Sequence, residues 1–414
     1  MVSGALAAVV LCAVLAPGAA ATPTLAPSTS AHSVPPAAPQ PTDSGNSPAV
    51  PDPHPPRGGR GPDGEPVGGA RLLSRNLVLP EGAPALPADL TAQAWVVVDL
   101  DQGDILAARD PHGRYQPASI QKVLTAVALL PQLPGQRKIT VSRQAASTEG
   151  SHAGLVGGGR YTIDQVFEGL LLVSGNDSAE ALAEAAGGRA KTVTLMNRTA
   201  LRLGAYDTYV QTPSGLDGWQ QLTSAYDMAL FLRAALGEAR FVRYDTVSHA
   251  RLPAQKVGGG FGPVNLDNQN QQFLTTVKGA LVAKTGFTDA AQHTFVGAIN
   301  RGGHRYGVVL LRAQRFPDDQ WVQATKLVDW ARALPAGTKP VGRLASPADT
   351  AQARADTAAG GPSAATSSRR AAAAGVASGG GAADGGTPLV VQLLVVLALV
   401  GGAVAFGWRL VRRR

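Results

Sequence analysis

Apolar residues form short runs bounded by turn residues in five segments of the central part of the chain. Runs rich in Val, Leu, Ile and aromatic residues are typical of β-strands. Asp101–Asp104 has a turn composition and separates the first two runs, which we expect to pair as a hairpin. The predicted strands cover residues 94–100, 105–108, 279–284, 293–299 and 306–312.

Helical spacing of apolar residues marks most of the segments between these strands. Thr162 and Gln165 stand three residues apart at the start of one of them, which is the pattern of a capping box. A hairpin, several helices, three strands and a last helix predict an α/β (α+β) domain in which helices flank an antiparallel sheet. The predicted helices cover residues 119–130, 162–172, 177–184, 191–203, 224–236 and 317–334.

Composition changes on both sides of this patterned region. Pro, Ser and Gly dominate residues 22–75, whereas Ala, Gly, Ser and Thr dominate residues 336–386. Segments so poor in large apolar residues bury too little surface to offset the entropy lost on ordering. We therefore expect a disordered spacer, a single folded domain over residues 76–335, and a disordered linker.

Apolar runs lie near both ends of the chain. Residues 5–16 are apolar and Ala19–Ala21 offers a small-residue cleavage site, which predicts a signal peptide over residues 1–21, with a membrane anchor as the alternative. Residues 389–408 are almost wholly apolar and, as a helix, would span roughly 30 Å of bilayer. The arginines of residues 409–414 predict a basic cytoplasmic tail. We expect a single-pass cell-membrane protein whose folded domain is extracellular.

The cysteine content and the net charge of the chain exclude some classes of protein function. The only cysteine, Cys12, lies in the expected signal peptide, so thiol catalysis and cysteine-based metal sites are excluded for the mature chain. The formal net charge of +8 at pH 7 comes partly from the terminal arginines. We interpret this charge as a sign of membrane topology and expect no nucleic-acid partner, no cofactor and no metal.

Ser119 and Lys122 stand three residues apart at the start of a predicted helix, so their side chains share one face. A serine hydroxyl becomes a good nucleophile when a base takes its proton, and a buried lysine with a lowered pKa can be that base. The alternative is a capping serine beside a surface lysine. Of the eight lysines, only Lys122 has a serine three residues before it.

Two further short motifs carry polar side chains. Ser174–Asn176 forms a Gly-containing turn between two predicted helices, where a hydroxyl and an amide could face a cleft or simply cap a helix. Lys284–Gly286 ends a predicted strand. Its cation and hydroxyl could hold a carboxylate while Gly286 lets a substrate backbone approach. The alternative for Lys284 is a charged edge residue that discourages aggregation.

In order and rough separation, three segments resemble the low-molecular-weight D-alanyl-D-alanine carboxypeptidases, which are serine penicillin-binding proteins. These segments are Pro117–Lys122, Ser174–Ala183 and Lys284–Ala291. Three shorter segments also resemble this family, namely residues 212–217, 224–229 and 268–270. The resemblance covers about residues 92–334 and implies a β-lactamase/transpeptidase-like fold.

The resemblance also implies roles for single residues. Ser119 would form the acyl-enzyme, Lys122 would accept its proton, and Ser174 would relay a proton to the leaving amine. The backbone N–H groups of Ser119 and Phe287 would form the oxyanion hole. The reaction would be the removal of the terminal D-alanine from a wall peptide.

Substrate contacts are implied in the same way. Asn176 would hold the substrate amide, Lys284 and Thr285 would grip its terminal carboxylate, and Gly286 would lie beside its backbone. The expected partners are peptidoglycan stem peptides as substrates and β-lactams as inhibitors. No metal takes part in this scheme.

Some positions and functions stay open. Gln121 stands where the family usually has Thr, and Gln292 stands where a Gly normally follows the paired alanines. A class A-like β-lactamase and a catalytically idle wall-binding or sensor protein of the same fold are the alternative functions. The Glu-x-x-x-Asn pattern that supplies a water-activating glutamate in class A β-lactamases is missing between Asn176 and Lys284.

Overall fold

The central sheet brings together strands from both ends of the folded region. The structure is a computed structural model, and it describes residues 58–351. Within this range one antiparallel sheet has the strand order β1-β3-β2-β10-β9-β8, with β11 paired to β3. Short hairpins β4–β5 and β6–β7 lie outside it. The strands are β1 (Leu77–Val78), β2 (Ala94–Asp99), β3 (Asp104–Arg109), β4 (Lys138–Thr140), β5 (Arg160–Thr162), β6 (His249–Leu252), β7 (Val264–Asp267), β8 (Ala280–Thr288), β9 (Gln292–Arg301), β10 (His304–Ala313) and β11 (Gly342–Arg343).

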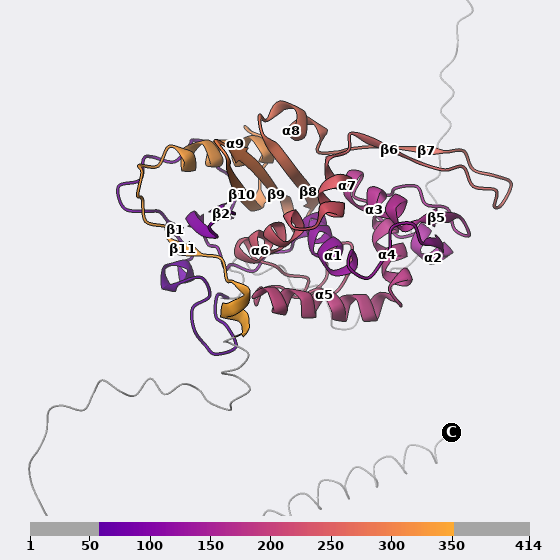
Figure 1. Cartoon of the computed structure of the whole chain (residues 1–414), viewed down its shortest axis with the longest axis horizontal. Coiled ribbons are helices and arrows are strands. Elements are labelled where there is room, and N and C mark those ends of the chain that lie inside the picture. The colour runs from indigo at the N-terminus through magenta and orange to yellow at the C-terminus, as the bar shows by residue number, and fades with distance from the viewer. Residues whose placement is uncertain (1–57, 352–414) are drawn as a thin grey trace, which may run out of the picture. The chain divides into compact units, whose positions relative to one another are not determined.

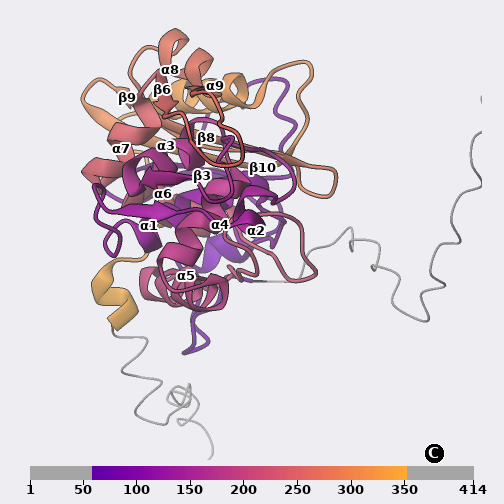
Figure 2. The same cartoon turned by 90° about the vertical axis from the view of Figure 1, so that its right-hand side faces the viewer.

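Helices cover both faces of this sheet. Figures 1 and 2 show α9 on one side and α1, α5 and α6 on the other. The predicted α/β (α+β) fold class, an antiparallel sheet flanked by helices, is therefore confirmed. The helices are η1 (Ala70–Leu73), η2 (Ala118–Gln121), α1 (Lys122–Leu129), α2 (Arg143–Ala146), α3 (Ile163–Leu172), α4 (Asn176–Ala185), α5 (Arg189–Leu203), α6 (Ala225–Leu236), α7 (Ala239–Thr246), α8 (Gln271–Thr276) and α9 (Gln320–Arg332).

Strand β2 shows how the sheet divides the core. All five residues of Ala94–Val98 are buried, because β2 lies inside the sheet between β3 and β10. Successive side chains point to opposite faces. Trp95 and Val97 pack in the cluster that contains Leu327 of α9, whereas Val96 packs in the larger cluster under α1 and α6. The consecutive valines of β2 therefore contribute to the hydrophobic clusters on both faces of the sheet.

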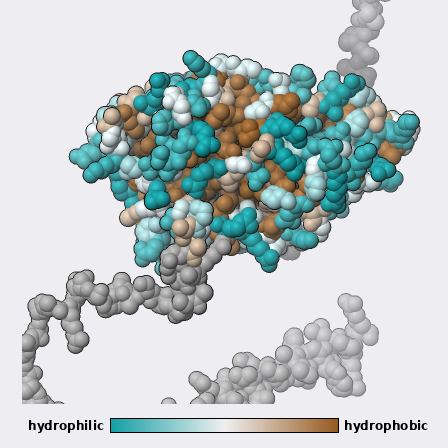
Figure 3. Space-filling view, in the orientation of Figure 1, coloured by the Kyte–Doolittle hydropathy of each residue, from teal (hydrophilic) through white to brown (hydrophobic). Residues whose placement is uncertain are grey.

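The helix predictions hold, with one change that concerns the site. Thr162 and Gln165 form both hydrogen bonds of the predicted capping box at the start of α3. The helix expected from residue 119 is divided: Ser119 lies in the 3-10 turn η2, and the α-helix begins at Lys122. On the face seen in Figure 3, apolar residues gather toward the middle and hydrophilic ones predominate around them.

The expected domain boundaries at residues 76 and 335 are too narrow. On the N-terminal side, the Gly59 amide donates to Asp207 Oδ1 (3.0 Å), and Leu72 is fully buried. Because these residues make buried contacts, the spacer prediction fails over residues 58–75. The turns and the 3-10 helix in this stretch depend on tertiary contacts that composition does not reveal.

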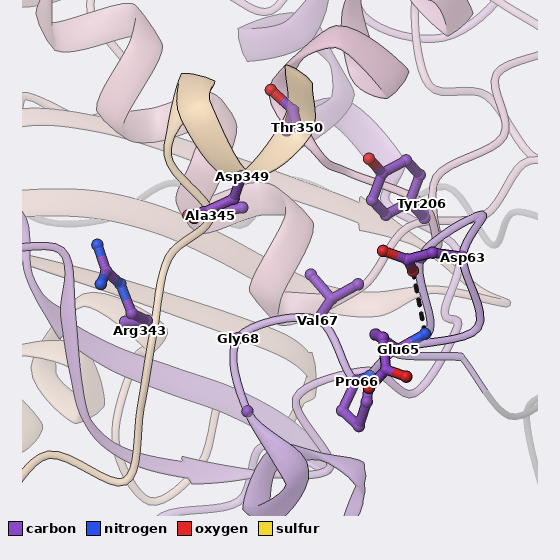
Figure 4. Close-up of a pocket in the computed structure, with 12 residues that line it drawn as sticks. Asp63, Glu65, Pro66, Val67, Gly68, Tyr206, Arg343, Ala345, Asp349 and Thr350 are labelled. Carbon is purple, nitrogen blue, oxygen red and sulfur yellow. Dashed lines mark hydrogen bonds between the residues drawn. The ribbon is translucent and has the colours of Figure 1, made fainter. Parts of the chain in front are cut away.

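The C-terminal flank, residues 336–351, also packs against the folded domain, where it contacts Tyr226 of α6. The Tyr226 hydroxyl donates to the Arg343 carbonyl (3.0 Å) and accepts a hydrogen bond from the Ala345 amide (2.8 Å). The linker prediction therefore fails over residues 336–351. Both flanks line an open pocket of about 340 Å³, to which the N-terminal flank contributes Val67, the C-terminal flank contributes Arg343 and Thr350, and the segment after α5 contributes Tyr206 (Figure 4).

The remaining topology predictions fall outside residues 58–351. They concern the signal peptide over 1–21, the first part of the spacer, most of the linker, the transmembrane helix over 389–408 and the tail over 409–414. Within the described range, no helix has both the length and the apolar character needed to cross a membrane.

Candidate active site

Ser119 and Lys122 occupy the junction of η2 and α1, at the edge strand β8. Ser119 lies in the first turn of η2, where backbone N–H groups lack partners within the helix. Lys122 opens α1, whose eight residues are all buried. Its side chain is fully buried and reaches Ser119 Oγ at 2.8 Å. The alternative of a snorkelling surface lysine is therefore wrong.

The Lys122 amine has three oxygen neighbours of two kinds. Its Nζ lies 2.8 Å from Asn176 Oδ1 and 2.7 Å from the Ser214 carbonyl, and neither of these oxygens can donate a proton. The third neighbour, Ser119 Oγ, can donate one. A neutral amine would use its two N–H groups on the carbonyl oxygens and direct its lone pair at the serine hydroxyl. This arrangement suits a general base.

The electrostatic surroundings favour that neutral form. Burial lowers the pKa of Lys122 well below its usual range, and the nearby positive charge of Lys284 lowers it further. The carboxylate of Asp177 acts in the opposite direction and raises the Lys122 pKa. Because burial is the largest of these effects, the apolar packing around α1 is what prepares the base.

Ser174 and Asn176 come from the turn between α3 and α4. Ser174 has a φ of 60°, a left-handed conformation that is uncommon for serine and that stores strain at functional sites. Its side chain is 3% exposed, and its Oγ has no hydrogen-bond partner among residues 58–351. Asn176 Nδ2 donates to the Glu149 carbonyl (2.7 Å), which leaves Oδ1 facing Lys122. The simple helix-cap alternative is wrong for this turn, because the side chains of Ser174 and Asn176 cap no helix.

Strand β8 supplies the opposite side. The strand was expected to end at Lys284–Gly286, but it continues to Thr288 because its pairing with β9 extends to Gln292. A Cβ atom on Gly286 would lie 2.7 Å from the Ser119 amide nitrogen, so only glycine permits this close approach. Thr285 Oγ1 donates to Asn270 Oδ1 (3.2 Å).

Lys284 is not a charged edge residue that discourages aggregation. It is 1% exposed, and its Nζ donates to the Thr285 carbonyl (2.8 Å). Burial lowers the pKa of Lys284 to about 8, although the carboxylate of Asp245 opposes this shift. The ammonium therefore lies beneath the surface of the site, and it is largely charged at neutral pH.

These residues border a cleft of about 440 Å³. Five of the eight predicted site residues line it, namely Ser119, Ser174, Thr285, Gly286 and Phe287. The other three, Lys122, Asn176 and Lys284, are buried behind this surface. The structure thus gathers all three sequence motifs around one cleft.

The cleft also contains residues that the sequence analysis did not assign. Asn270 and Arg315 line it, and the Ser214 carbonyl contacts Lys122. Asn270 and Ser214 lie in segments already noted as similar to the family, so they could have been proposed. Arg315 follows β10 outside every motif considered, and no signal in the sequence indicated it.

The motif geometry agrees with the comparison to protein families. The family model for D-alanyl-D-alanine carboxypeptidase, Peptidase S11, matches residues 81–315. The chain belongs to this family. The recognition of a serine-type D-Ala-D-Ala carboxypeptidase is therefore confirmed at the family level.

Individual relatives agree with this placement. D-alanyl-D-alanine carboxypeptidase DacB2 of Mycobacterium tuberculosis is 38% identical over 261 residues, which are 62% of this chain and 87% of the relative. DacF of Bacillus subtilis, another D-alanyl-D-alanine carboxypeptidase, is 29% identical over 246 residues, 58% of this chain and 62% of the relative. In both cases the similarity covers more than half of this chain.

Solved structures of the family share the fold. The crystal structure of a D-alanyl-D-alanine carboxypeptidase from M. tuberculosis H37Rv matches with a TM-score of 0.61 at 38% identity, covering 64% of this chain and all of the other. The Streptomyces K15 DD-transpeptidase matches with a TM-score of 0.56 at 24% identity, covering 61% of this chain and 100% of its own. At that identity the second likeness supports the fold alone. The transpeptidase-like fold implied by the motifs is confirmed.

The two departures from the family pattern lie in different settings. Gln121 is fully buried in η2, and its amide has no hydrogen-bond partner among the described residues. Gln292 opens β9 with a φ of 55°, the left-handed region that favours glycine. The glycine usual at this position in the family would relieve that strain.

Proposed function

We propose that this protein is a serine-type D-Ala-D-Ala carboxypeptidase that acts on peptidoglycan stem pentapeptides through an acyl-enzyme on Ser119. The observation that carries the proposal is the environment of Lys122. A buried amine with two carbonyl acceptors and one hydroxyl neighbour is arranged to take the serine proton. Family membership supports the choice of substrate.

Acylation would begin when Ser119 Oγ attacks the carbonyl carbon between the last two D-alanines. Its proton passes to Lys122 Nζ as the C–O bond forms. The N–H groups of Ser119 and Phe287 would hold the oxyanion, whose charge develops only in the transition state. The C–N bond then breaks, and the released D-alanine amine takes a proton through Ser174, which lines the cleft and whose Oγ has no partner among residues 58–351. Water then attacks the acyl carbon, the bond to Ser119 Oγ breaks, and Ser119 takes back its proton as the shortened peptide leaves.

Substrate would lie along β8. In the described sheet β8 is an edge strand, so an extended peptide can add to it by backbone hydrogen bonds. Thr285 and Arg315 both line the cleft. Arg315 keeps N–H groups besides the Nε–H that Asp319 accepts, and these could contact a terminal carboxylate. The Thr285 hydroxyl could do the same if it turned away from Asn270 Oδ1. Lys284 would contribute positive potential from beneath. Asn176 was expected to hold the substrate amide, but its Oδ1 lies at Lys122 and its Nδ2 donates to the Glu149 carbonyl, so we propose that it acts on the base instead.

The β-lactamase alternative needs a group that activates water against the acyl-enzyme. Among the described residues that line the cleft, the only carboxylate is Asp319, and its Oδ1 accepts a hydrogen bond from Arg315 (2.7 Å). Deacylation then depends on the room left for water at the acyl carbon, so the bulky acyl group derived from penicillin should leave slowly, whereas the smaller acyl group of a wall peptide should leave faster. We propose that the enzyme is penicillin-sensitive and does not act as a β-lactamase.

Location and physiological role belong to the same proposal. The apolar runs at residues 5–16 and 389–408 support export and a C-terminal anchor in the cell membrane, with the catalytic domain extracellular. An enzyme placed there could trim stem peptides during cell-wall remodelling. Protease accessibility of the domain in intact cells would test this topology, because protection from an added protease would contradict it.

The activity is tested with a synthetic pentapeptide ending in D-Ala-D-Ala. Incubation with the purified protein should release free D-alanine, and Ser119→Ala should release none. An inactive wild-type protein that still binds the peptide would favour the idle, wall-binding alternative. Fast, repeated hydrolysis of penicillin with no trapped adduct would favour the β-lactamase.

A further inference from the structure

The start of α4 holds a loop that borders the cleft. Asp177 is fully buried, and its carboxylate accepts four backbone hydrogen bonds. Oδ1 accepts from Ala153 (2.9 Å) and Ser178 (2.8 Å), while Oδ2 accepts from Gly154 (3.0 Å) and Leu155 (2.9 Å). Three of these four donors belong to the loop of residues 149–155. One side chain therefore fixes the path of that loop.

The neighbouring residue, Asn176, is held by the same loop. Its backbone N–H donates to the Ser151 carbonyl (2.7 Å), and its Nδ2 donates to the Glu149 carbonyl (2.7 Å). The second bond decides which end of the Asn176 amide faces Lys122. With Nδ2 turned to Glu149, Oδ1 is left to accept from Lys122. The loop thus sets the orientation of an amide that contacts the base.

The contact between loop and helix has no spare room. A Cβ atom on Gly150 would lie 2.6 Å from Asn176 Nδ2, and one on Gly175 would lie 2.9 Å from the Ala153 amide nitrogen. Gly150 also has a φ of 87°, which strains any other residue. Small residues at both positions allow the loop to seat directly on Asn176 and Asp177. Ser151 of this loop lines the cleft.

We propose that Asp177 is a positioning residue for acylation. It holds loop 149–155 in place, the loop orients the Asn176 amide, and the amide fixes the Lys122 amine against Ser119. The inference rests on the proposed roles of Ser119 and Lys122. It adds a residue that does not touch the substrate, but whose loss misplaces the base.

Asp177 also acts on Lys122 through its charge. Among the described residues, the charged groups that act on Lys122 are Lys284 from β8, which lowers its pKa, and Asp177 from α4, which raises it. Removing the carboxylate should lower the Lys122 pKa further. Because the neutral amine is the active form, the acid limb of the acylation rate should then move to lower pH.

The test compares Asp177→Asn with Asp227→Asn in the whole protein. Asp227 is also fully buried, and its Oδ2 accepts from the Asp207 amide (2.9 Å) and from Thr208 Oγ1 (2.7 Å), so it controls for the replacement of a buried, hydrogen-bonded acidic side chain. The readout is the single-turnover rate constant for acylation by penicillin, measured from pH 5 to pH 9. A rate constant counts only folded enzyme, so loss of stability alone does not change it.

Asp177→Asn should lower the acylation rate constant by roughly 10²-fold, the effect of misplacing a catalytic group by about 1 Å. It should also move the acid limb to lower pH, whereas Asp227→Asn should change neither. An unchanged rate constant, or an unmoved acid limb, would overturn the proposal. A wild-type protein that forms no adduct on Ser119 would instead overturn the proposed function beneath it.

Gly150→Ala tests the contact between loop 149–155 and Asn176 by changing the loop instead of Asp177. This variant decides whether the loop positions the base if Asp177→Asn does not fold. The added methyl group would displace the loop from Asn176 while the Asp177 charge stays in place. We expect slower acylation with the acid limb at its wild-type pH. Acylation at the wild-type rate would show that the loop does not position the base.

Discussion

The two walls of the cleft hold their lysines in different ways. On the helical wall, made by Ser119, Lys122, Ser174 and Asn176, the Lys122 amine has three oxygen neighbours and is fully buried. On the strand wall, made by residues 284–287 of β8, Lys284 Nζ donates a single hydrogen bond among the described residues. Both lysines are buried, but only one has all its hydrogen-bonding positions occupied.

This difference separates two tasks. A group that takes a proton benefits from fixed acceptors and a dry site, because these set both its pKa and the direction of its lone pair. A group that holds a substrate keeps unused donors for it, and the Lys284 ammonium has two. We therefore assign proton transfer to the helical wall and carboxylate recognition to the strand wall.

Loss of the base should have the largest effect. Lys122→Met keeps much of the buried volume but removes the amine, and acylation by penicillin should slow by roughly 10²–10⁴-fold. Raising the pH should recover part of the rate, because hydroxide can replace the lost base. The exposed Lys138 offers a control, since Lys138→Met should acylate like the wild type. Equal rates for both variants would remove Lys122 from the mechanism.

Lys284→Met should give a smaller and different effect. Losing this cation raises the pKa of Lys122, so the acid limb of acylation should move to higher pH, opposite to the shift expected for Asp177→Asn. The pH profile of acylation by penicillin measures this directly. A shift to lower pH, or none, would show that the two lysines are not coupled.

The pH profile of peptide hydrolysis by the wild-type protein should also show the loss of the Lys284 charge on its basic side. The Lys284 pKa of about 8 means that its charge is present below that pH and is lost above it. Hydrolysis of a peptide with a free terminal carboxylate should therefore decline as the pH rises through about 8. A matched peptide amide lacks the charge that Lys284 would hold, so its profile should lack this limb.

The two walls also differ in how well the sequence predicted them. Seven of the eight proposed site residues lie in three short motifs and Phe287 was implied by the family resemblance, and the structure gathers these segments around one cleft. Burial was harder to foresee: Lys284 was expected at the end of a strand, and only pairing with β9 shows that β8 continues and covers it. Arg315 was missed because a single arginine after a strand has no local pattern.

The flanks show the limit of composition as a guide. Residues 58–75 contain Pro and Gly in proportions typical of a spacer, yet Gly59 and Leu72 make specific buried contacts with residues distant in the chain. Secondary-structure patterning cannot reveal a segment whose order comes from tertiary contacts alone. The catalytic domain is accordingly wider than the patterned region.

Stability measurements can test this wider boundary. A protein comprising residues 76–335 should be less stable than one comprising residues 58–351 by at least about 2 kcal/mol, the contribution of one buried leucine such as Leu72. Urea unfolding followed by circular dichroism would give the difference. The shorter protein should still acylate while folded, because neither wall of the cleft lies in the flanks. Equal stability would restore the boundaries at 76 and 335.

Gln292→Gly should have the smallest effect, and in the favourable direction. It relieves the left-handed conformation at the start of β9, where a side chain costs about 1 kcal/mol or slightly more. It also loses the hydrogen bond from Gln292 Nε2 to the Asp289 carbonyl (2.6 Å), so the net gain should be below about 1 kcal/mol. Acylation should be unchanged. A destabilised variant would show that the side-chain bond outweighs the strain.

The central claim is that Ser119 carries the acyl group, and intact-mass spectrometry tests it most directly. Full-length protein mixed with penicillin should gain the mass of one penicillin within the first measurement and keep it for minutes or longer. Peptide mapping should place the adduct on Ser119. Ser119→Ala should fold normally, because the Ser119 side chain caps no helix, and should gain no mass. An adduct that persists in Ser119→Ala, or that maps to another residue in the wild type, would contradict the account.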